Sequence, residues 1–376
     1  MAWLSEQKQN AEVNRLIGML RNSDISKRNA AARQLIQLGA NAAPGLVAAL
    51  GNKEQVLNSL LQQILVRIGS DAIPVLSQAL HEGMSIIQQE AASILGEIGD
   101  STTLPVLLEA LPSENYKLQM AAALALGKIG DQHALPQLLN TLSDSDPDVR
   151  IAVATAIGQF RMPNTYLNLA DLLDDPEINV RQVVAQILGE TGDPIVIPYL
   201  VDALYDSFWW YGREQAIEVL LNAIRNFGKQ AFEPLSQAMS AKEPTVRRHV
   251  ISLLAALKDP RSLEPLQMAF YDPNYDVAEI AAKVLIDFGQ TAMPIFVEAL
   301  ASPNDWIREQ AIVAIAAIGG DNAVSAIINM LNDTAQPVRV ATLKALGQLK
   351  DARAIPALNE IASDRSDKEA SRLARQ

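Results

Sequence analysis

The sequence predicts an all-α protein in which about eleven to twelve helix pairs follow one another as an α-solenoid. Three observations support this prediction. A glycine-rich position recurs mostly every 30 or 31 residues, a proline follows it within five to seven residues, and an arginine-rich position precedes it by eleven. Repeats of about 20–50 residues are typical of solenoids, so we expect the 376 residues to form one array of stacked pairs.

The glycine-rich position predicts where the second helix of each pair ends. A residue just past a helix end often adopts the left-handed conformation, which glycine reaches without strain. Lys and Arg at three of the positions would suit the negative end of a helix. The members are Gly39, Gly69, Gly99, Gly130, Arg161, Gly192, Gly228, Lys258, Gly289, Gly319 and Lys350.

The proline position predicts where the next first helix begins, because proline has no N–H to lose in the first helical turn. Residues 136–142 are one such helix. Leu167 and Ser325 replace proline in two copies. The members are Pro44, Pro74, Pro105, Pro136, Pro198, Pro234, Pro265, Pro294 and Pro356.

The arginine-rich position is predicted to open the second helix, as in residues 149–157. A polar turn such as 143–148 precedes it and offers acceptors that can cap the helix. The members are Arg28, Asn58, Gln88, Gln119, Arg150, Arg181, Arg213, Arg247, Ala278, Arg308 and Arg339.

The two ends of the array need polar outer faces. Residues 1–40 are therefore predicted to form an N-terminal capping repeat and residues 351–376 a C-terminal cap, in which 364–372 are almost wholly polar. The sequence contains no linker or low-complexity stretch, so residues 1–376 are treated as a single solenoid.

These motifs resemble a known family. The proline-led helix, the Asp-rich turn, the Val-Arg pair and the ending Ala-Leu-Gly-Lys-Ile-Gly-Asp at 125–131 are similar to HEAT repeats, in particular to the short type named after phycobilisome lyases. The resemblance covers essentially the whole chain. It implies a right-handed superhelix with the second helices on the concave, binding face, and a cyanobacterial or algal setting.

The arginine position has two interpretations. It could form an anion-binding ladder along the surface. The HEAT resemblance instead implies that each arginine pairs with acceptors in a neighbouring turn, and this interpretation is preferred. The candidate acceptors are Asp144, Asp146, Asp148, Asp174 and Asp175.

One ridge of the second helices is predicted to face water, because it is mainly polar while its neighbours are apolar. Its middle positions are Arg33, Gln63, Ser93, Leu124, Thr155, Gln186, Glu218, Ser252, Lys283, Val313 and Lys344. Apolar exceptions on the ridge are Met120, Leu124 and Ile151, and further along the chain Val313, Ala317 and Val340. They predict either a docking patch for a partner or a curvature that buries them.

The repeat at 194–230 is irregular, since Pro198 and Pro234 lie 36 residues apart. The alignment places one extra residue in the turn and about four in the second helix. The turn carries Phe208, Trp209, Trp210 and Tyr211. Trp306 stands shortly before residues 308–312, whose sequence Arg-Glu-Gln-Ala-Ile is identical to that of residues 213–217. Aromatic side chains are favoured anchors in interfaces. The alternative is that they fill a gap made by the longer helix.

Composition excludes several classes of function. The net charge of −12 disfavours nucleic acid. The absence of cysteine excludes disulfides and a thiolate nucleophile. The three histidines fall in separate repeats, so no metal site is expected. The sequence also shows no signal peptide and no apolar run of membrane-spanning length, which predicts a cytoplasmic protein without membrane insertion.

Two functions remain. The first is a non-catalytic scaffold without cofactors that binds a protein partner, which the resemblance implies is a phycobiliprotein or another photosynthetic component. The second is a bilin lyase that transiently holds an open-chain tetrapyrrole and attaches it to a cysteine of a phycobiliprotein. The scaffold is favoured because the repeat explains nearly every residue without chemistry. The candidate partner-binding residues are Phe208, Trp209, Trp210, Tyr211, Trp306, Met120, Leu124 and Ile151.

Overall fold

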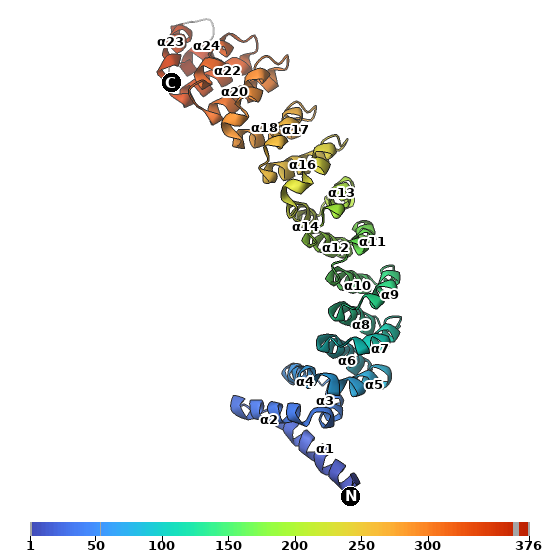
Figure 1. Ribbon diagram of the computed structural model, residues 1–376. Helices are drawn as coiled ribbons and strands as arrows, with labels where there is room; N and C mark the ends of the chain where they lie inside the picture. Colours follow the sequence, from blue (N-terminus) through green and yellow to red (C-terminus); the bar gives the residue numbers. More distant parts are fainter. Residues whose placement is uncertain (1, 53, 364–367, 375–376) are drawn as a thin grey trace. The chain divides into compact units, whose positions relative to one another are not determined.

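The computed structural model describes residues 2–52, 54–363 and 368–374, and this part of the chain contains helices and turns but no strand. Two compact units meet in sequence after Val196. Within each unit, first and second helices alternate in chain order, and in ten of the twelve pairs the second helix is the longer one (Figure 1). The predicted all-α solenoid is confirmed.

The unit that ends at Val196 contains six helix pairs. Its first helices are α1 (Ala2–Met19), α3 (Ala43–Ala48), α5 (Ile73–Glu82), α7 (Leu104–Ala110), α9 (Leu135–Thr141) and α11 (Pro163–Ala170). Its second helices are α2 (Ile25–Leu38), α4 (Gln55–Ile68), α6 (Ser85–Ile98), α8 (Tyr116–Ile129), α10 (Pro147–Gln159) and α12 (Ile178–Glu190).

The unit that begins at Ile197 has the same organisation. Its first helices are α13 (Ile197–Asp202), α15 (Phe232–Ala238), α17 (Leu263–Phe270), α19 (Met293–Ala299), α21 (Ala323–Ile327) and α23 (Ile355–Ser363). Its second helices are α14 (Glu214–Arg225), α16 (Pro244–Leu257), α18 (Tyr275–Asp287), α20 (Asp305–Ile318), α22 (Gln336–Leu349) and α24 (Lys368–Ala374). Residues 364–367 of the predicted polar C-terminal cap lie outside the described part.

The backbone confirms the position predicted to end each second helix. All eleven of its members have a positive φ, including the three that are not glycine, Arg161 at 51°, Lys258 at 48° and Lys350 at 51°. These three are the only non-glycine residues with a positive φ in the described part of the chain. The periodic turn therefore imposes the left-handed conformation even where the side chain opposes it.

The other two periodic positions also mark helix starts. Each proline lies within the first three residues of a first helix. The arginine position lies slightly deeper than predicted, since Arg150, Arg247 and Arg308 are each the fourth residue of their helix. The residue before the second helix is often a cap: Asp146 and Asn304 accept hydrogen bonds from backbone N–H groups of α10 and α20.

The predicted ridge of the second helices faces solvent. Nine of its eleven middle positions are exposed, and the other two, Leu124 and Thr155, are half-buried. The positions four residues further on, from Gln37 to Gln348, are all exposed. The second helices therefore present a mainly polar surface in both units.

Buried arginine–aspartate pairs join successive repeats. Arg150 of α10 donates two hydrogen bonds of 2.7 Å to the Asp175 carboxylate in the next turn, and a third of 2.8 Å to the Asp144 carbonyl in its own turn. Arg308 of α20 does the same with Asp333 and the Ser302 carbonyl, each bond being 2.8 Å. We call this arrangement a rung. It confirms that the arginine position is structural at these repeats.

The irregular repeat differs from the prediction. Helix α14 has 12 residues, fewer than the 14 of α16, so the extra residues do not lengthen the second helix and that prediction was wrong. They lie in the turn before it. Gly212 has a φ of 70° and Arg213 is the residue before α14, which stops the helix from starting one turn earlier. The helix therefore begins about four residues later, relative to Arg213, than the alignment predicted. Because four residues make about one helical turn, the predicted ridge residues of α14 still face solvent.

The aromatic residues of this turn mostly pack against the turn itself. Trp209 is fully buried, and Trp210 donates from its indole to the Leu204 carbonyl at 3.1 Å. The Arg213 guanidinium lies 3.9 Å from the centre of the Phe208 ring and donates to the Phe208 carbonyl at 3.0 Å. Tyr211, at 79% exposure, is the aromatic residue that projects into solvent.

His249 of α16 is a half-buried titratable group. Its Nε2 atom is buried without a hydrogen-bond partner in the described part of the chain. Burial lowers the pKa of His249, and the neighbouring Arg248 lowers it further, while Glu218 raises it and Arg225 lowers it by smaller amounts. The folded protein therefore favours the neutral imidazole.

We predict that Trp209→Ala lowers the free energy of unfolding by about 3–5 kcal/mol, because it empties a fully buried site. Tyr211→Ala, two residues away and exposed, should change it by less than about 0.5 kcal/mol. Urea denaturation followed by circular dichroism measures both. Equal effects of the two variants would contradict the buried position of Trp209.

Breaking a rung should also destabilise the fold. Asp333→Ala leaves the Arg308 guanidinium, whose side chain is 12% exposed, without its carboxylate, and we expect a loss of about 3 kcal/mol. The exposed pair Lys283–Glu279 provides the control, since Glu279→Ala should cost less than about 0.5 kcal/mol. A loss for Asp333→Ala no larger than the control would show that the rung contributes little.

Stability should fall as the pH drops below about 6.5, the ordinary pKa of histidine, because the unfolded chain then takes up a proton that folded His249 resists. The slope from this one group is at most about 1.4 kcal/mol per pH unit, and it ends at the lowered pKa of the folded state. Urea denaturation between pH 7.5 and 5 measures the slope. His249→Gln should reduce it, and an unchanged slope would refute this account.

Candidate functional site

The junction between α18 and α20, in the unit that begins at Ile197, lacks a rung. Rungs join residues 25 positions apart, and here those positions hold Ala278 of α18 and Pro303 of the turn before α20. The preceding junction has Arg247 paired with Asp272 at 2.6 Å, and the following one has Arg308 paired with Asp333. Apolar packing holds the junction between them instead, as in the Phe270–Phe296 ring contact with centres 5.5 Å apart.

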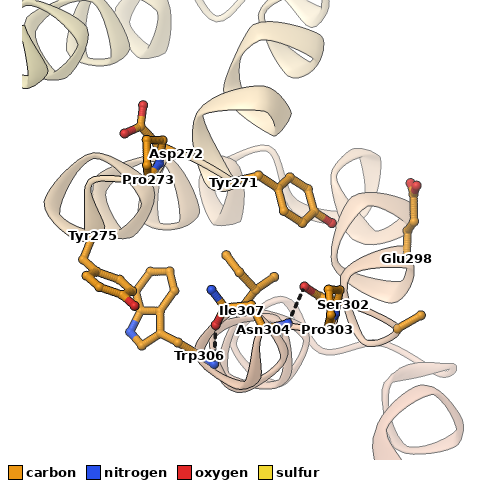
Figure 2. A pocket seen from close by; sticks show the side chains of 11 residues that line it. Tyr271, Asp272, Pro273, Tyr275, Glu298, Ser302, Pro303, Asn304, Trp306 and Ile307 are labelled. Carbon is orange, nitrogen blue, oxygen red and sulfur yellow. Dashed lines mark hydrogen bonds between the residues drawn. The ribbon is translucent and has the colours of Figure 1, made fainter. Parts of the chain in front are cut away.

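A groove of about 540 Å³ opens at this junction (Figure 2). It runs between two successive inter-helix turns, the one joining α17 to α18 and the one joining α19 to α20. We call it the aromatic groove. It is lined by Tyr271, Asp272, Pro273, Tyr275, Glu298, Ala301, Ser302, Pro303, Asn304, Trp306 and Ile307.

Aromatic rings form the sides of the aromatic groove. Tyr275 and Trp306 meet edge to face with ring centres 5.2 Å apart. Figure 2 shows the Tyr271 ring on the other side, with Ile307 between it and Trp306. Ile307 is buried, whereas Tyr271 and Tyr275 are 42% and 61% exposed. The groove therefore has an apolar floor and accessible ring faces.

Local hydrogen bonds fix Trp306 at the start of α20. The Asn304 side chain accepts from the Trp306 N–H at 3.0 Å, and the Asp305 side chain accepts from it at 2.9 Å. Asn304 in turn donates from its own N–H to the Ser302 hydroxyl at 3.2 Å. This cap sets the direction in which α20 begins, and so the position of the indole.

The charged residues that line the aromatic groove are both acidic. The Asp272 carboxylate is occupied by Arg247 and points away from the rings in Figure 2. Glu298 is exposed, and its nearest recorded partner is the neutral Gln267 amide at 3.4 Å. Burial raises the pKa of the Tyr271 hydroxyl, and the negative charge of Glu298 raises it further. The groove is thus suited to a cation.

A second hollow, of about 460 Å³, lies on the second helices of the other unit. It is lined by Tyr116, Lys117, Met120 and Leu124 of α8, together with Ser93 of α6. Lys128 at its edge pairs with Glu97 at 2.5 Å. We call this the α8 hollow. It interrupts the polar ridge with apolar side chains that are half-buried and accessible.

A third groove, of about 680 Å³, has the same place in its repeat as the aromatic groove. It lies between the turns before α8 and α10, where Gln119 stands at the arginine position and donates to Asp144 at 2.8 Å. Tyr116, the first residue of α8, lines it just as Tyr275, the first residue of α18, lines the aromatic groove. Open grooves therefore occur at two junctions where arginine is replaced.

The structure separates the sequence-predicted binding residues. Met120 and Leu124 meet in the α8 hollow, but Ile151 of α10 does not line it. Trp306 lies in the aromatic groove. Within residues 208–211, Trp209 is fully buried, Phe208 and Trp210 are half-buried, and Tyr211 is exposed.

Tyr271 and Tyr275 were not identified from the sequence. The available signal was Ala278 at the arginine position, which marks the junction as irregular, with Tyr271 in the preceding turn and Tyr275 at the start of the helix. At the apolar exceptions further along the ridge, Val313 and Ala317 are exposed and Val340 is half-buried.

Within residues 2–52, 54–363 and 368–374, no three His, Asp or Glu side chains gather closely enough to hold a metal ion. None of the helices described here is both long enough and apolar enough to span a bilayer.

Solved structures with a similar fold include the karyopherin Kap121p. Kap121p bound to Ste12p matches over 96% of this chain with a TM-score of 0.57 and 14% identity. Kap121p bound to Pho4p matches over 94% with 0.56 and 14%. The complex with the extreme C-terminus of the protein phosphatase Cdc14p matches over 95% with 0.56 and 14%. The chain spans 46–48% of the length of these proteins, and at this identity the likeness concerns the fold.

No curated protein matches the chain in a sequence comparison. The family profile for HEAT repeats matches residues 73–142, 135–221, 219–286 and 293–376, which is well over half of the chain. Together with the helix pairs, the left-handed turns and the arginine rungs, this match shows that the chain belongs to the HEAT-repeat family.

Proposed function

We propose that this HEAT-repeat chain is a non-catalytic scaffold that binds a protein partner through its second-helix surface. The observation that carries the proposal is the α8 hollow, where Met120 and Leu124 open an apolar site in a ridge that is otherwise polar and solvent-facing. Apolar side chains in an exposed hollow are suited to take an apolar side chain of a partner.

The energetics favour a single anchored side chain at this place. Burying an aliphatic side chain yields about 1.5–3 kcal/mol, which corresponds to roughly tenfold to a hundredfold in affinity. Lys117 and the exposed Tyr116 border the hollow and can add polar contacts at its rim. The hollow therefore supports one hot spot within a larger interface.

Kap121p, which shares the fold, is solved in complexes with Pho4p, Ste12p and the C-terminus of Cdc14p. These complexes support protein binding as a use of this architecture. The finer setting, a phycobiliprotein or another photosynthetic component as partner, is supported by the resemblance of the repeat motif to the phycobilisome-lyase type.

The alternative function, a bilin lyase, rests on the same resemblance. A test is co-expression with a bilin-producing pathway and apo-phycobiliprotein subunits, followed by absorbance of the purified subunits. Covalent pigment on a subunit that needs this chain would establish the lyase. Pigment-free subunits together with a stable complex would favour the scaffold.

We predict that Met120→Glu combined with Leu124→Glu weakens partner binding at least about tenfold, because two carboxylates cannot be desolvated in the apolar hollow. The partner is first identified by photo-crosslinking from position 124 in the native cell and then purified. Isothermal titration calorimetry compares the double variant with the parent protein.

Gln186→Glu combined with Ser252→Glu is the matched control, because both residues are exposed on the same ridge away from the hollow. The control should bind like the parent protein, and both variants should retain the helical circular dichroism signal. Unchanged affinity of the Met120/Leu124 variant for the crosslinked partner would refute the proposed docking site.

A further inference from the structure

We propose that the aromatic groove binds an arginine side chain from an extended segment of the partner. The inference rests on the proposed function, because it assigns a recognition element to the same protein-binding scaffold. It names a second site, in the unit that begins at Ile197, and gives the chemistry of its occupant. Three features of the aromatic groove support it independently: the missing rung, the rings and the charge.

The missing rung leaves a place built for a guanidinium. At the neighbouring junctions, the arginine donates to carbonyl groups of its own turn, as Arg247 does to Ala241 at 2.6 Å and Lys242 at 2.8 Å. The corresponding carbonyls in the groove belong to Asp272 and Pro273. Ala278 has no guanidinium to offer them, so these acceptors are available to an arginine from outside.

The rings offer the stacking surface that a guanidinium prefers. The chain itself shows this pairing twice. Arg213 lies 3.9 Å from the centre of the Phe208 ring, and Arg261 lies 4.3 Å from the centre of the Phe232 ring. In the groove, Tyr271 and the Tyr275–Trp306 pair lie on opposite sides of Ile307, so a guanidinium that enters the groove can stack on one of its exposed rings.

The charge of the groove selects a cation over a neutral or anionic side chain. No Lys or Arg lines it, and the Glu298 carboxylate lies at its edge without a basic partner among the described residues. A volume of about 540 Å³ exceeds that of one side chain, so residues flanking the arginine have room along the groove. An extended segment can follow a groove that lies between two turns, with its arginine side chain directed inward.

Fluorine NMR can test this inference without the natural partner. The chain has four tryptophans, and labelling with 5-fluorotryptophan gives one signal for each. Trp306→Phe identifies the Trp306 signal by its loss. The probe is the synthetic peptide acetyl-Ser-Pro-Arg-Pro-Ser-amide, with Lys and Gln versions of the central residue. The arginine peptide should shift the Trp306 signal selectively, the lysine peptide should bind about threefold to tenfold more weakly, and the glutamine peptide should leave the signal unchanged.

Three variants of the aromatic groove serve as controls. Ala278→Arg combined with Pro303→Asp installs the missing rung and should abolish the shift, while Tyr271→Ala should weaken binding about threefold to tenfold by removing one ring. Glu298→Gln should also weaken it. If the rung variant does not fold, as judged by circular dichroism, Tyr271→Ala and Glu298→Gln still decide the question.

Equal shifts by the glutamine and arginine peptides would overturn the assignment and indicate recognition of the prolines. No shift by any peptide at 10 mM, a concentration well above about 1 mM for a single weak anchor, would also overturn it. The proposed function is tested separately at the α8 hollow with the crosslinked partner. A failure here with intact binding there would refute the arginine site and leave the scaffold in place.

Discussion

The buried arginine–aspartate rung fixes the stacking of successive turns at the junctions of Arg150, Arg247 and Arg308. A single guanidinium, such as that of Arg308, bonds to a carbonyl of its own turn and to the carboxylate of Asp333 in the next turn. It therefore fixes the spacing of two turns that no covalent bond joins directly. A buried ion pair is tolerable in this place because several donors of the arginine fork find acceptors and the aspartate also receives a backbone N–H. The hydrogen bonds that the Arg308 side chain donates accordingly hold the pKa of Asp333 below its usual range.

The same constraint explains where the protein can carry a site. A filled rung occupies the space between two turns, whereas Ala278 and Pro303 leave that space empty. Gln119 is an intermediate case, since its shorter side chain reaches Asp144 with one hydrogen bond and a groove still opens beside it. Replacing arginine costs the junction an interaction that packing must offset, here through Phe270 and Phe296. What the junction gains is accessible surface lined by tyrosines.

Sequence periodicity predicted the features that are decided locally. The left-handed turn needs one residue with a positive φ, and the period located all eleven, even at Arg161 where the side chain gives no hint of it. The ridge was predictable for the same reason, because helical geometry fixes the facing of each position. The irregular repeat was not. Residues 213–217 repeat the pentapeptide at 308–312, yet the first copy begins just before α14 and the second lies four residues into α20. The positive φ of Gly212 decided between two registers that the pentapeptide alone does not distinguish.

The candidate sites were predicted less well because each is a property of a junction. The aromatic residues at 208–211 stand out in the sequence, but in the structure Trp209 is buried and the Arg213 guanidinium lies over the Phe208 ring. The aromatic groove instead combines Tyr271 and Tyr275 from one repeat with Trp306 from the next, residues that lie about thirty positions apart. No single column of the repeat reveals this group. It becomes visible when two columns are read together: a missing arginine at one position and aromatic residues in the turns on either side. In this solenoid, the periodic residues therefore define the stacking, and paired departures from the period indicate where a groove opens between two turns.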